Sequence, residues 1–167
     1  VSTSSVSISI LQTKEIPVTA SASGTPADGY AATGEVTCAP DRVTVAGRSS
    51  VLANLESVVI PPEAVDLTGA EENVVELIDI REYLPDGVSL TNTSADGFNG
   101  RVTVTAVVEP LEDATRRLEP AQIQFLNVPQ GWQVAVDPDD PVYVRLRGLE
   151  QNLAAVDASQ LSGTIDV

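Results

Sequence analysis

The 167-residue sequence predicts a mainly β protein that contains two copies of one β-rich module. Polar and apolar residues alternate in several segments, which is typical of half-buried strands. Clusters rich in Pro and Gly separate these segments and predict turns. Hydrophobic residues make up 43% of the chain and aromatic residues only 4%, so we expect a core of Val, Ile, Leu and Ala.

Strands dominate the predicted elements, and helices are few and short. The clearest alternation predicts strands at 5–10, 42–47, 101–108 and 142–148. Shorter apolar segments predict further strands at 15–20, 74–80, 121–126, 132–136 and 163–167. Apolar residues at helical spacing predict short helices at 48–56 and 149–155.

The stretch "RVTVAGRSSVLANL" at 42–55 has the outline of a phosphate-binding loop, namely a strand, a glycine and a helix start. A Walker loop also needs a second glycine and a Lys before Ser or Thr, and both are missing here. We therefore interpret the stretch as a corner. In this interpretation Gly47 relieves backbone strain, and Ser49 or Ser50 caps the helix.

An internal repeat is the strongest evidence for the modular organisation. Four landmarks recur in the same order at an offset of 100 to 102 residues: a turn aromatic, a strand-ending glycine, a helical leucine and a late aspartate. The pairs are Tyr30 and Trp132, Gly47 and Gly148, Leu52 and Leu153, and Asp66 and Asp166. We assign the first copy to 1–109 and a truncated second copy to 110–167, which lacks the counterpart of 68–108.

The repeated motifs resemble those of the YbbR family. The turn before the aromatic reads "PADGY" and "PQGW", and the strand into the glycine reads "APDRVTVAG" and "DPVYVRLRG". A helix with a leucine follows in "SSVLANLESV" and "EQNLAAVDAS". The "VDLTG" segment at 65–69 and the closing "VTVTAVVEP" complete the likeness, which covers essentially the whole chain.

The resemblance implies both a fold and a role. It implies tandem β-modules with short helices, similar to the C-terminal domain of ribosomal protein L25. It also implies an extracytoplasmic protein of Gram-positive bacteria, held at the cell membrane by a helix outside this chain. The chain starts at Val1 rather than Met, and we expect it to be part of a longer protein.

Two functions follow from the resemblance and the repeat. In the first, the chain is a non-enzymatic module that modulates a membrane protein, such as the diadenylate cyclase that makes cyclic di-AMP, through protein–protein contact. In the second, it is a structural spacer that holds other domains off the membrane. We expect no catalytic residue and no cofactor in either case.

Composition excludes several classes of function. The formal net charge of −15 repels phosphate backbones, so nucleic-acid binding is disfavoured, including the RNA binding that the L25 likeness suggests. The chain has no histidine, which excludes a Ser-His-Asp triad, a Cys-His pair and a His-based zinc site within this chain. Its single cysteine excludes an intrachain disulfide.

The weak metal candidate is "DPDDP" at 137–141, which gathers Asp137, Asp139 and Asp140. Three carboxylates can contribute to a calcium site, but calcium takes six to eight oxygen ligands and this loop lacks the EF-hand pattern. The alternative is a solvated turn stiffened by proline, and we favour it.

Other conspicuous residues have structural interpretations. Tyr30 and Trp132 could form a recognition site, but large aromatic side chains usually pack in or beside a core, and we expect packing for both. Cys38 is expected to be a buried, inert thiol. The pair Glu71 and Glu72 is expected to lie on a solvated face.

Overall fold

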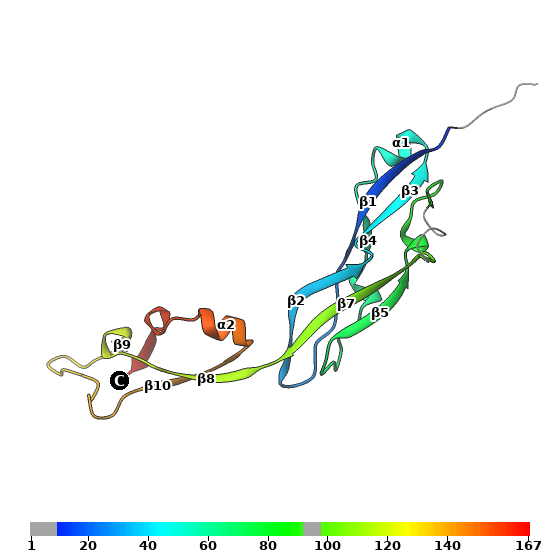
Figure 1. The fold of residues 1–167 in the computed structure, drawn as a ribbon. Helices are drawn as coiled ribbons and strands as arrows, with labels where there is room; N and C mark the ends of the chain where they lie inside the picture. The colour runs from blue at the N-terminus through cyan, green and yellow to red at the C-terminus, as the bar shows by residue number, and fades with distance from the viewer. Residues whose placement is uncertain (1–9, 92–97) are drawn as a thin grey trace, which may run out of the picture. The chain divides into compact units, whose positions relative to one another are not determined.

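A computed structural model describes residues 10–91 and 98–167 of the chain (Figure 1). The chain forms two compact units, Val1–Glu109 and Pro110–Val167, and these are the ranges assigned above to the two repeats. The described residues form eleven strands, two short α-helices and four 3-10 turns. This confirms the predicted fold class, a mainly β protein with short helical pieces.

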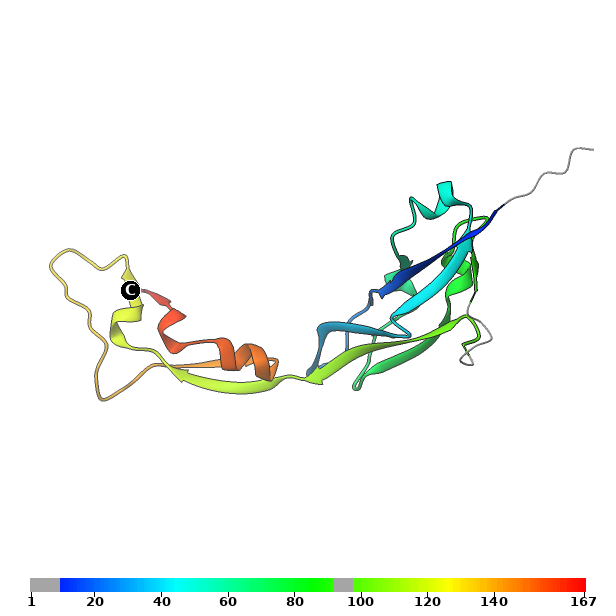
Figure 2. The ribbon, with the colours of Figure 1, turned by 45° about the horizontal axis from the view of Figure 1, so that its top comes forward.

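The first unit consists of two sheets packed face to face, as Figure 2 shows. One sheet has the order β4-β1-β3-β6, formed by Val58–Ile60, Gln12–Ala20, Arg42–Gly47 and Ser89–Leu90. The other has the order β2-β7-β5, formed by Tyr30–Ala39, Arg101–Pro110 and Val74–Asp79. The helix α1 (Ser49–Leu52) follows β3, and 3-10 turns span Pro62–Ala64 and Ile80–Tyr83.

The core between these sheets is made of the aliphatic residues that the composition predicts. Burial alternates strictly along strand β7: its even-numbered residues from Val102 to Val108 are buried, and its odd-numbered residues are not. They meet side chains from the facing sheet, chiefly Ile16, Val18, Val43, Val45, Val58 and Ile60. Each such side chain stabilises the fold by roughly 1.5–3 kcal/mol when fully buried.

The second unit has a smaller set of elements. Strand β8 (Glu112–Arg117) pairs with β10 (Tyr143–Gly148), and β9 (Ile123–Leu126) pairs with β11 (Gly163–Asp166). The helix α2 (Glu150–Ala155) follows β10, and 3-10 turns span Pro120–Gln122 and Ala158–Gln160. Four hydrophobic residues of this unit are buried, namely Leu118, Ile123, Leu149 and Leu153.

The pairing register of the first strand pair is the same in both units. In the first unit β1 and β3 are antiparallel, with Gln12 opposite Gly47 and Pro17 opposite Arg42. In the second, β8 and β10 are antiparallel, with Glu112 opposite Gly148 and Arg117 opposite Tyr143. The landmark glycine therefore closes a six-residue ladder in each unit.

A cation on the first strand bonds to the short helix in both units. The Lys14 ammonium donates to the carbonyl oxygens of Leu52 and Leu55 at 3.0 and 2.8 Å. The Arg116 guanidinium donates to the carbonyl oxygen of Leu153 at 3.3 Å. The last carbonyls of a helix lack intrahelical partners and carry partial negative charge, so a cation there stabilises the helix end.

Most strand predictions are confirmed, but that for 132–136 is wrong. Its counterpart in the first unit is the start of β2, which pairs with β7. The second unit has no counterpart of β7 among its residues, so 132–136 has no edge to pair with. Residues 5–9 of the first predicted strand lie outside the described residues. The strands β2, β4, β6 and β8 were not predicted.

Gly24 lies where two chain segments approach each other closely. Ser23 bridges Asp66, and the Asp66 carboxylate accepts hydrogen bonds from the Thr68 amide at 2.9 Å and its hydroxyl at 2.6 Å. A Cβ at position 24 would collide with Asp66 and Thr68. Gly24 also has φ of +92°, in the region that favours glycine.

An ion pair marks the end of strand β5. The Asp79 carboxylate accepts hydrogen bonds from the Arg81 backbone amide at 3.1 Å and from its guanidinium, with an Nε–Oδ1 distance of 2.8 Å. The Arg81 guanidinium lowers the pKa of Asp79 to about 2. The pair therefore closes the strand and caps the following 3-10 turn.

Substituting Gly47→Ala will destabilise the first unit by about 1–2 kcal/mol, because a Cβ would lie 3.2–3.3 Å from Gly87 O, Leu52 and Val88. The matched control is Gly148→Ala, where a Cβ would lie 3.7 Å from Leu153, and its effect should stay within about 0.5 kcal/mol. Hydrogen exchange of the β3 and β10 amides measures the two effects separately. Equal effects would contradict the role of the Gly87–Val88 segment.

Substituting Gly24→Ala will destabilise the first unit by about 2 kcal/mol or more, through backbone strain and the collision with Asp66 and Thr68. Gly34→Ala is the control, because Gly34 also has positive φ (+85°) but no atom lies near its Cβ position. The control should cost about 1 kcal/mol, from the backbone alone. Thermal unfolding of the first unit, followed by NMR, compares them.

The Asp79–Arg81 pair will make stability depend on pH below about 4. Since the folded pKa of Asp79 is lowered to about 2, its contribution is present above the unfolded pKa and is lost as pH falls toward 2. The Arg81 side chain is mostly exposed, so solvent screening keeps the contribution of the pair at pH 7 small. A double-mutant cycle with Asp79→Asn and Arg81→Gln, measured at pH 7 and pH 2, should show coupling only at pH 7.

Candidate interaction surface

The corner at Gly47 is a packing feature and does not form a phosphate loop. Gly47 does not have positive φ, so the predicted relief of backbone strain is wrong, and the glycine is required by close approach instead. The predicted Ser49 or Ser50 cap is also wrong, because the cap position is Arg48 and no side chain caps the helix. The Arg48 carbonyl accepts from the amides of Val51 and Leu52 at 2.9 and 3.0 Å.

The second unit repeats this corner with different side chains. Leu149 occupies the cap position, and its carbonyl accepts from the amides of Asn152 and Leu153 at 3.0 and 2.9 Å. Because the same backbone geometry forms with Leu149 and Glu150 in place of Arg48 and Ser49, the corner does not depend on groups that bind phosphate.

The three aspartates of the calcium hypothesis form a turn. The Asp137 carboxylate accepts a hydrogen bond from the Asp139 amide at 2.9 Å, and the Asp137 carbonyl accepts from the Asp140 amide at 3.1 Å. Within 10–91 and 98–167, no group of three or more acidic, Cys or His side chains converges to hold a metal ion. The structure therefore does not bring Asp137, Asp139 and Asp140 together as ligands.

The two landmark aromatics share a turn but differ in burial. The amides of Tyr30 and Trp132 donate to the carbonyls of Ala27 and Pro129 at 3.0 and 3.1 Å, and the preceding Gly29 and Gly131 have φ of +91° and +90°. Tyr30 packs against the core of the first unit, as predicted.

The predicted packing is wrong for Trp132, whose side chain is 73% exposed. Tyr30 lies beside residues 69–74, a segment without a counterpart in the second unit. The turn motif therefore sets the backbone at both aromatics, and the covering segment decides whether the ring is buried.

Cys38 is a half-buried thiol on β2, packed against the core. Burial raises its pKa above the ordinary value, and the nearby Asp41 carboxylate raises it further. Both effects disfavour the thiolate, which is the reactive form. This environment agrees with the inert thiol expected from the sequence.

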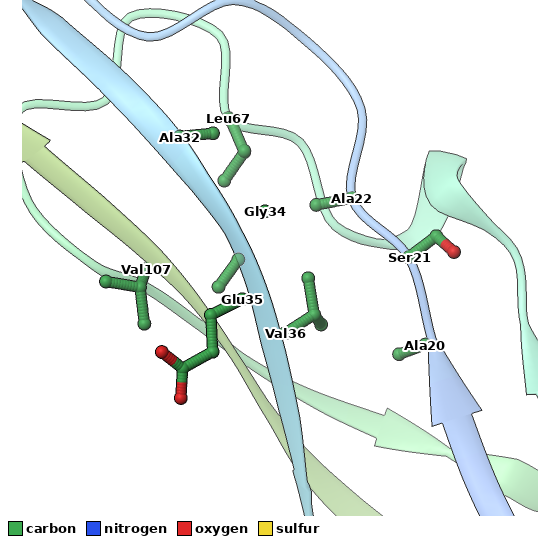
Figure 3. Close-up of a pocket in the computed structure, with 10 residues that line it drawn as sticks. Ala20, Ser21, Ala22, Ala32, Gly34, Glu35, Val36, Leu67 and Val107 are labelled. Atoms are coloured by element: carbon green, nitrogen blue, oxygen red, sulfur yellow. The ribbon is translucent and has the colours of Figure 1, made fainter. Parts of the chain in front are cut away.

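The first unit has a small hollow between the end of β1 and β2, with a volume of about 290 Å³. Figure 3 shows its lining, in which Ala22, Val36 and Leu67 surround the space and Glu35 leaves β2 on the side opposite Val36. Ligand pockets combine an apolar lining with a few convergent polar groups. The described core has no buried polar or charged side chain, so this hollow offers little chemistry for recognition.

Exposed apolar side chains form a more distinctive surface than any hollow. On the first unit they include Val75 and Leu77 of β5, which are 59% and 58% exposed. The sequence did not indicate this exposure, because the apolar run at 74–80 is equally consistent with a strand buried on both faces. Glu71 and Glu72, just before β5, are exposed as expected.

The described residues contain no helix that is long and apolar enough to cross a membrane.

Comparison with known proteins identifies the family of the first unit. The family model of YbbR-like proteins matches residues 16–108, more than half of the chain. No curated protein matches the chain. Among solved structures, SuR18C from Streptococcus thermophilus, determined in solution, is 19% identical, with a TM-score of 0.44, and the match covers 62% of this chain and 91% of that one. The matched range runs from Ile16 of β1 to Val108 of β7, which are both core residues, and the chain belongs to the YbbR-like protein family.

Proposed function

We propose that the chain is a non-catalytic extracytoplasmic module that binds and modulates a membrane protein. A membrane diadenylate cyclase, and hence cyclic di-AMP synthesis, is the first candidate partner. The observation that carries the proposal is the YbbR family match over residues 16–108, together with the partner type that the resemblance implies. Anchoring by a membrane helix outside this chain is part of the same proposal.

The second unit supports an arrangement of repeated modules. Its strand register, the cation on its short helix and its aromatic turn all match the first unit, although the two sequences share few residues. Independent folds would not be expected to share these three details in the same order, at offsets of 100 to 102 residues. We infer that Pro110–Val167 is part of a second YbbR-like repeat.

The chemistry of the described residues is consistent with binding rather than catalysis. Hydrogen bonds and ion pairs at the surface lower the pKa values of four carboxyl groups. Arginine partners have this effect at Asp79 and Asp113, and hydrogen bonds within turns have it at Asp66 and Asp157. The net charge of −15 favours contact with a protein over adsorption to anionic lipid.

The spacer function is the second candidate, and the division of the chain into two compact units, one after the other in the sequence, favours it. A spacer needs length and solubility but no specific surface. Exchanging the modules for unrelated β-modules of equal length distinguishes the two functions, because regulation survives the exchange only if the chain is a spacer.

The membrane-partner proposal predicts that the immobilised chain enriches a membrane protein from detergent-solubilised membranes. It also predicts that adding the chain to vesicles that contain a diadenylate cyclase changes the rate of cyclic di-AMP formation, which mass spectrometry measures. An unrelated β-module of similar charge is the control. Enrichment of no membrane protein, together with an unchanged cyclase rate, would count against the proposal.

A further inference from the structure

Among the described residues, strand β5 lies at a sheet edge that no other strand covers. It lies at the end of the β2-β7-β5 sheet and has six residues without Pro, Gly or Lys. The other edge strands of the first unit differ: β4 has three residues and is followed by Pro61 and Pro62, β6 has only two residues, and β2 contains Gly34 at φ +85°. Edge strands that lack such devices readily pair with another chain.

The backbone groups of Val75 and Leu77 point toward the open edge. The Ile80 amide donates to the Gly100 carbonyl at 3.0 Å, and the antiparallel register continues from there to Val74 opposite Ala106. In an antiparallel ladder, alternate residues bond to the partner strand, so the even-numbered residues of β5 bond to β7. The N–H and C=O groups of Val75 and Leu77 therefore face away from β7.

The side chains of the same two residues are also available. Val75 and Leu77 lie opposite Thr105 and Thr103 of β7, and each is more than half exposed. A strand added beside β5 would thus gain backbone hydrogen bonds from these residues and apolar contact with their side chains. This combination is the one used when an extended peptide adds to a sheet edge.

The acidic residues of β5 and of the segment before it indicate which kind of partner strand would bind there. Glu71 and Glu72 precede the strand, Glu76 lies within it, and no Lys or Arg occurs from residue 70 to 80. A partner strand with Lys or Arg would be attracted to this edge. In a second copy of the chain, the antiparallel register that pairs Val75 with Leu77 would place Glu76 opposite Glu76, which is unfavourable.

We propose that β5 of the first unit is a docking edge for an extended, basic segment of a partner protein, in which apolar residues alternate with Lys or Arg. The inference rests on the proposed function as a protein-binding module, and it specifies where the contact forms. It requires no change in the fold, because the added strand only extends the sheet.

The test uses the full chain labelled with ¹⁵N and an acetylated ten-residue peptide that alternates Lys and Val. We expect the peptide to protect the amides of Val75 and Leu77 from hydrogen exchange and to shift resonances of β5 and of Thr103 and Thr105. A peptide that alternates Glu and Val should bind at least about tenfold more weakly, because of like-charge repulsion. Protection elsewhere, or equal binding of the two peptides, would overturn the proposal.

Substitutions on two edge strands test whether the peptide binds at β5. The double variant Val75→Lys, Leu77→Lys should weaken binding of the Lys-Val peptide about tenfold or more, through lost cross-strand contacts and added like charge. Val59→Lys is the matched control, because Val59 is 61% exposed on the edge strand β4, and it should leave binding unchanged. Leu77→Pro removes one outward N–H while keeping the bonds to β7, so it should weaken binding in a folded chain.

Two further outcomes separate this proposal from its alternatives. If Val59→Lys weakens binding as much as the double variant, β5 is not the docking edge. If the wild-type chain forms dimers by sedimentation and the double variant does not, β5 pairs with a second copy instead. A membrane protein that is enriched equally by the wild type and the double variant would preserve the proposed function and remove this surface from it.

Discussion

The antiparallel register of β1 against β3 positions the other parts of the first unit. It aligns Ile16 with Val43 in the core and brings Gly47 to the end of the ladder, where its missing side chain leaves room for Leu52. The same register places Lys14 beside the terminal carbonyls of α1. Because side chains alternate along a strand, a slip of one residue would turn the core residues of β1 to the opposite face.

The second unit shows which features depend only on this register and which need a covering sheet. The strand ladder, the helix and the cation at its end form without a counterpart of residues 68–108. Burial of the turn aromatic does depend on the missing segment, since Tyr30 packs against the core while Trp132 is exposed. Crowding at the corner also differs, because Gly148 has no neighbour that corresponds to the Gly87–Val88 segment.

The proposed binding role agrees with the described residues, in which the buried side chains are aliphatic and exposed apolar side chains lie on an edge strand. The core of the first unit supplies rigidity, and its described part contains no buried polar or charged side chain. The edge of β5 combines backbone groups that bond to no other strand among the described residues, exposed Val75 and Leu77, and several acidic residues. Recognition by strand addition uses all three, and it requires no enclosed pocket.

The sequence by itself determined the mainly β class and the landmarks at Gly47, Leu52, Gly148 and Leu153, because periodicity and turn chemistry are local properties. Its motifs also indicated the family, through their resemblance to those of YbbR proteins. It did not reveal β8, since "EDATRR" has a low strand propensity and becomes a strand only by pairing with β10. Only the tertiary structure decided that 132–136 is not a strand, that Trp132 is exposed and that Val75 and Leu77 lie on an open edge. These outcomes depend on which segment lies beside each residue, and a neighbour distant in the chain leaves no local pattern.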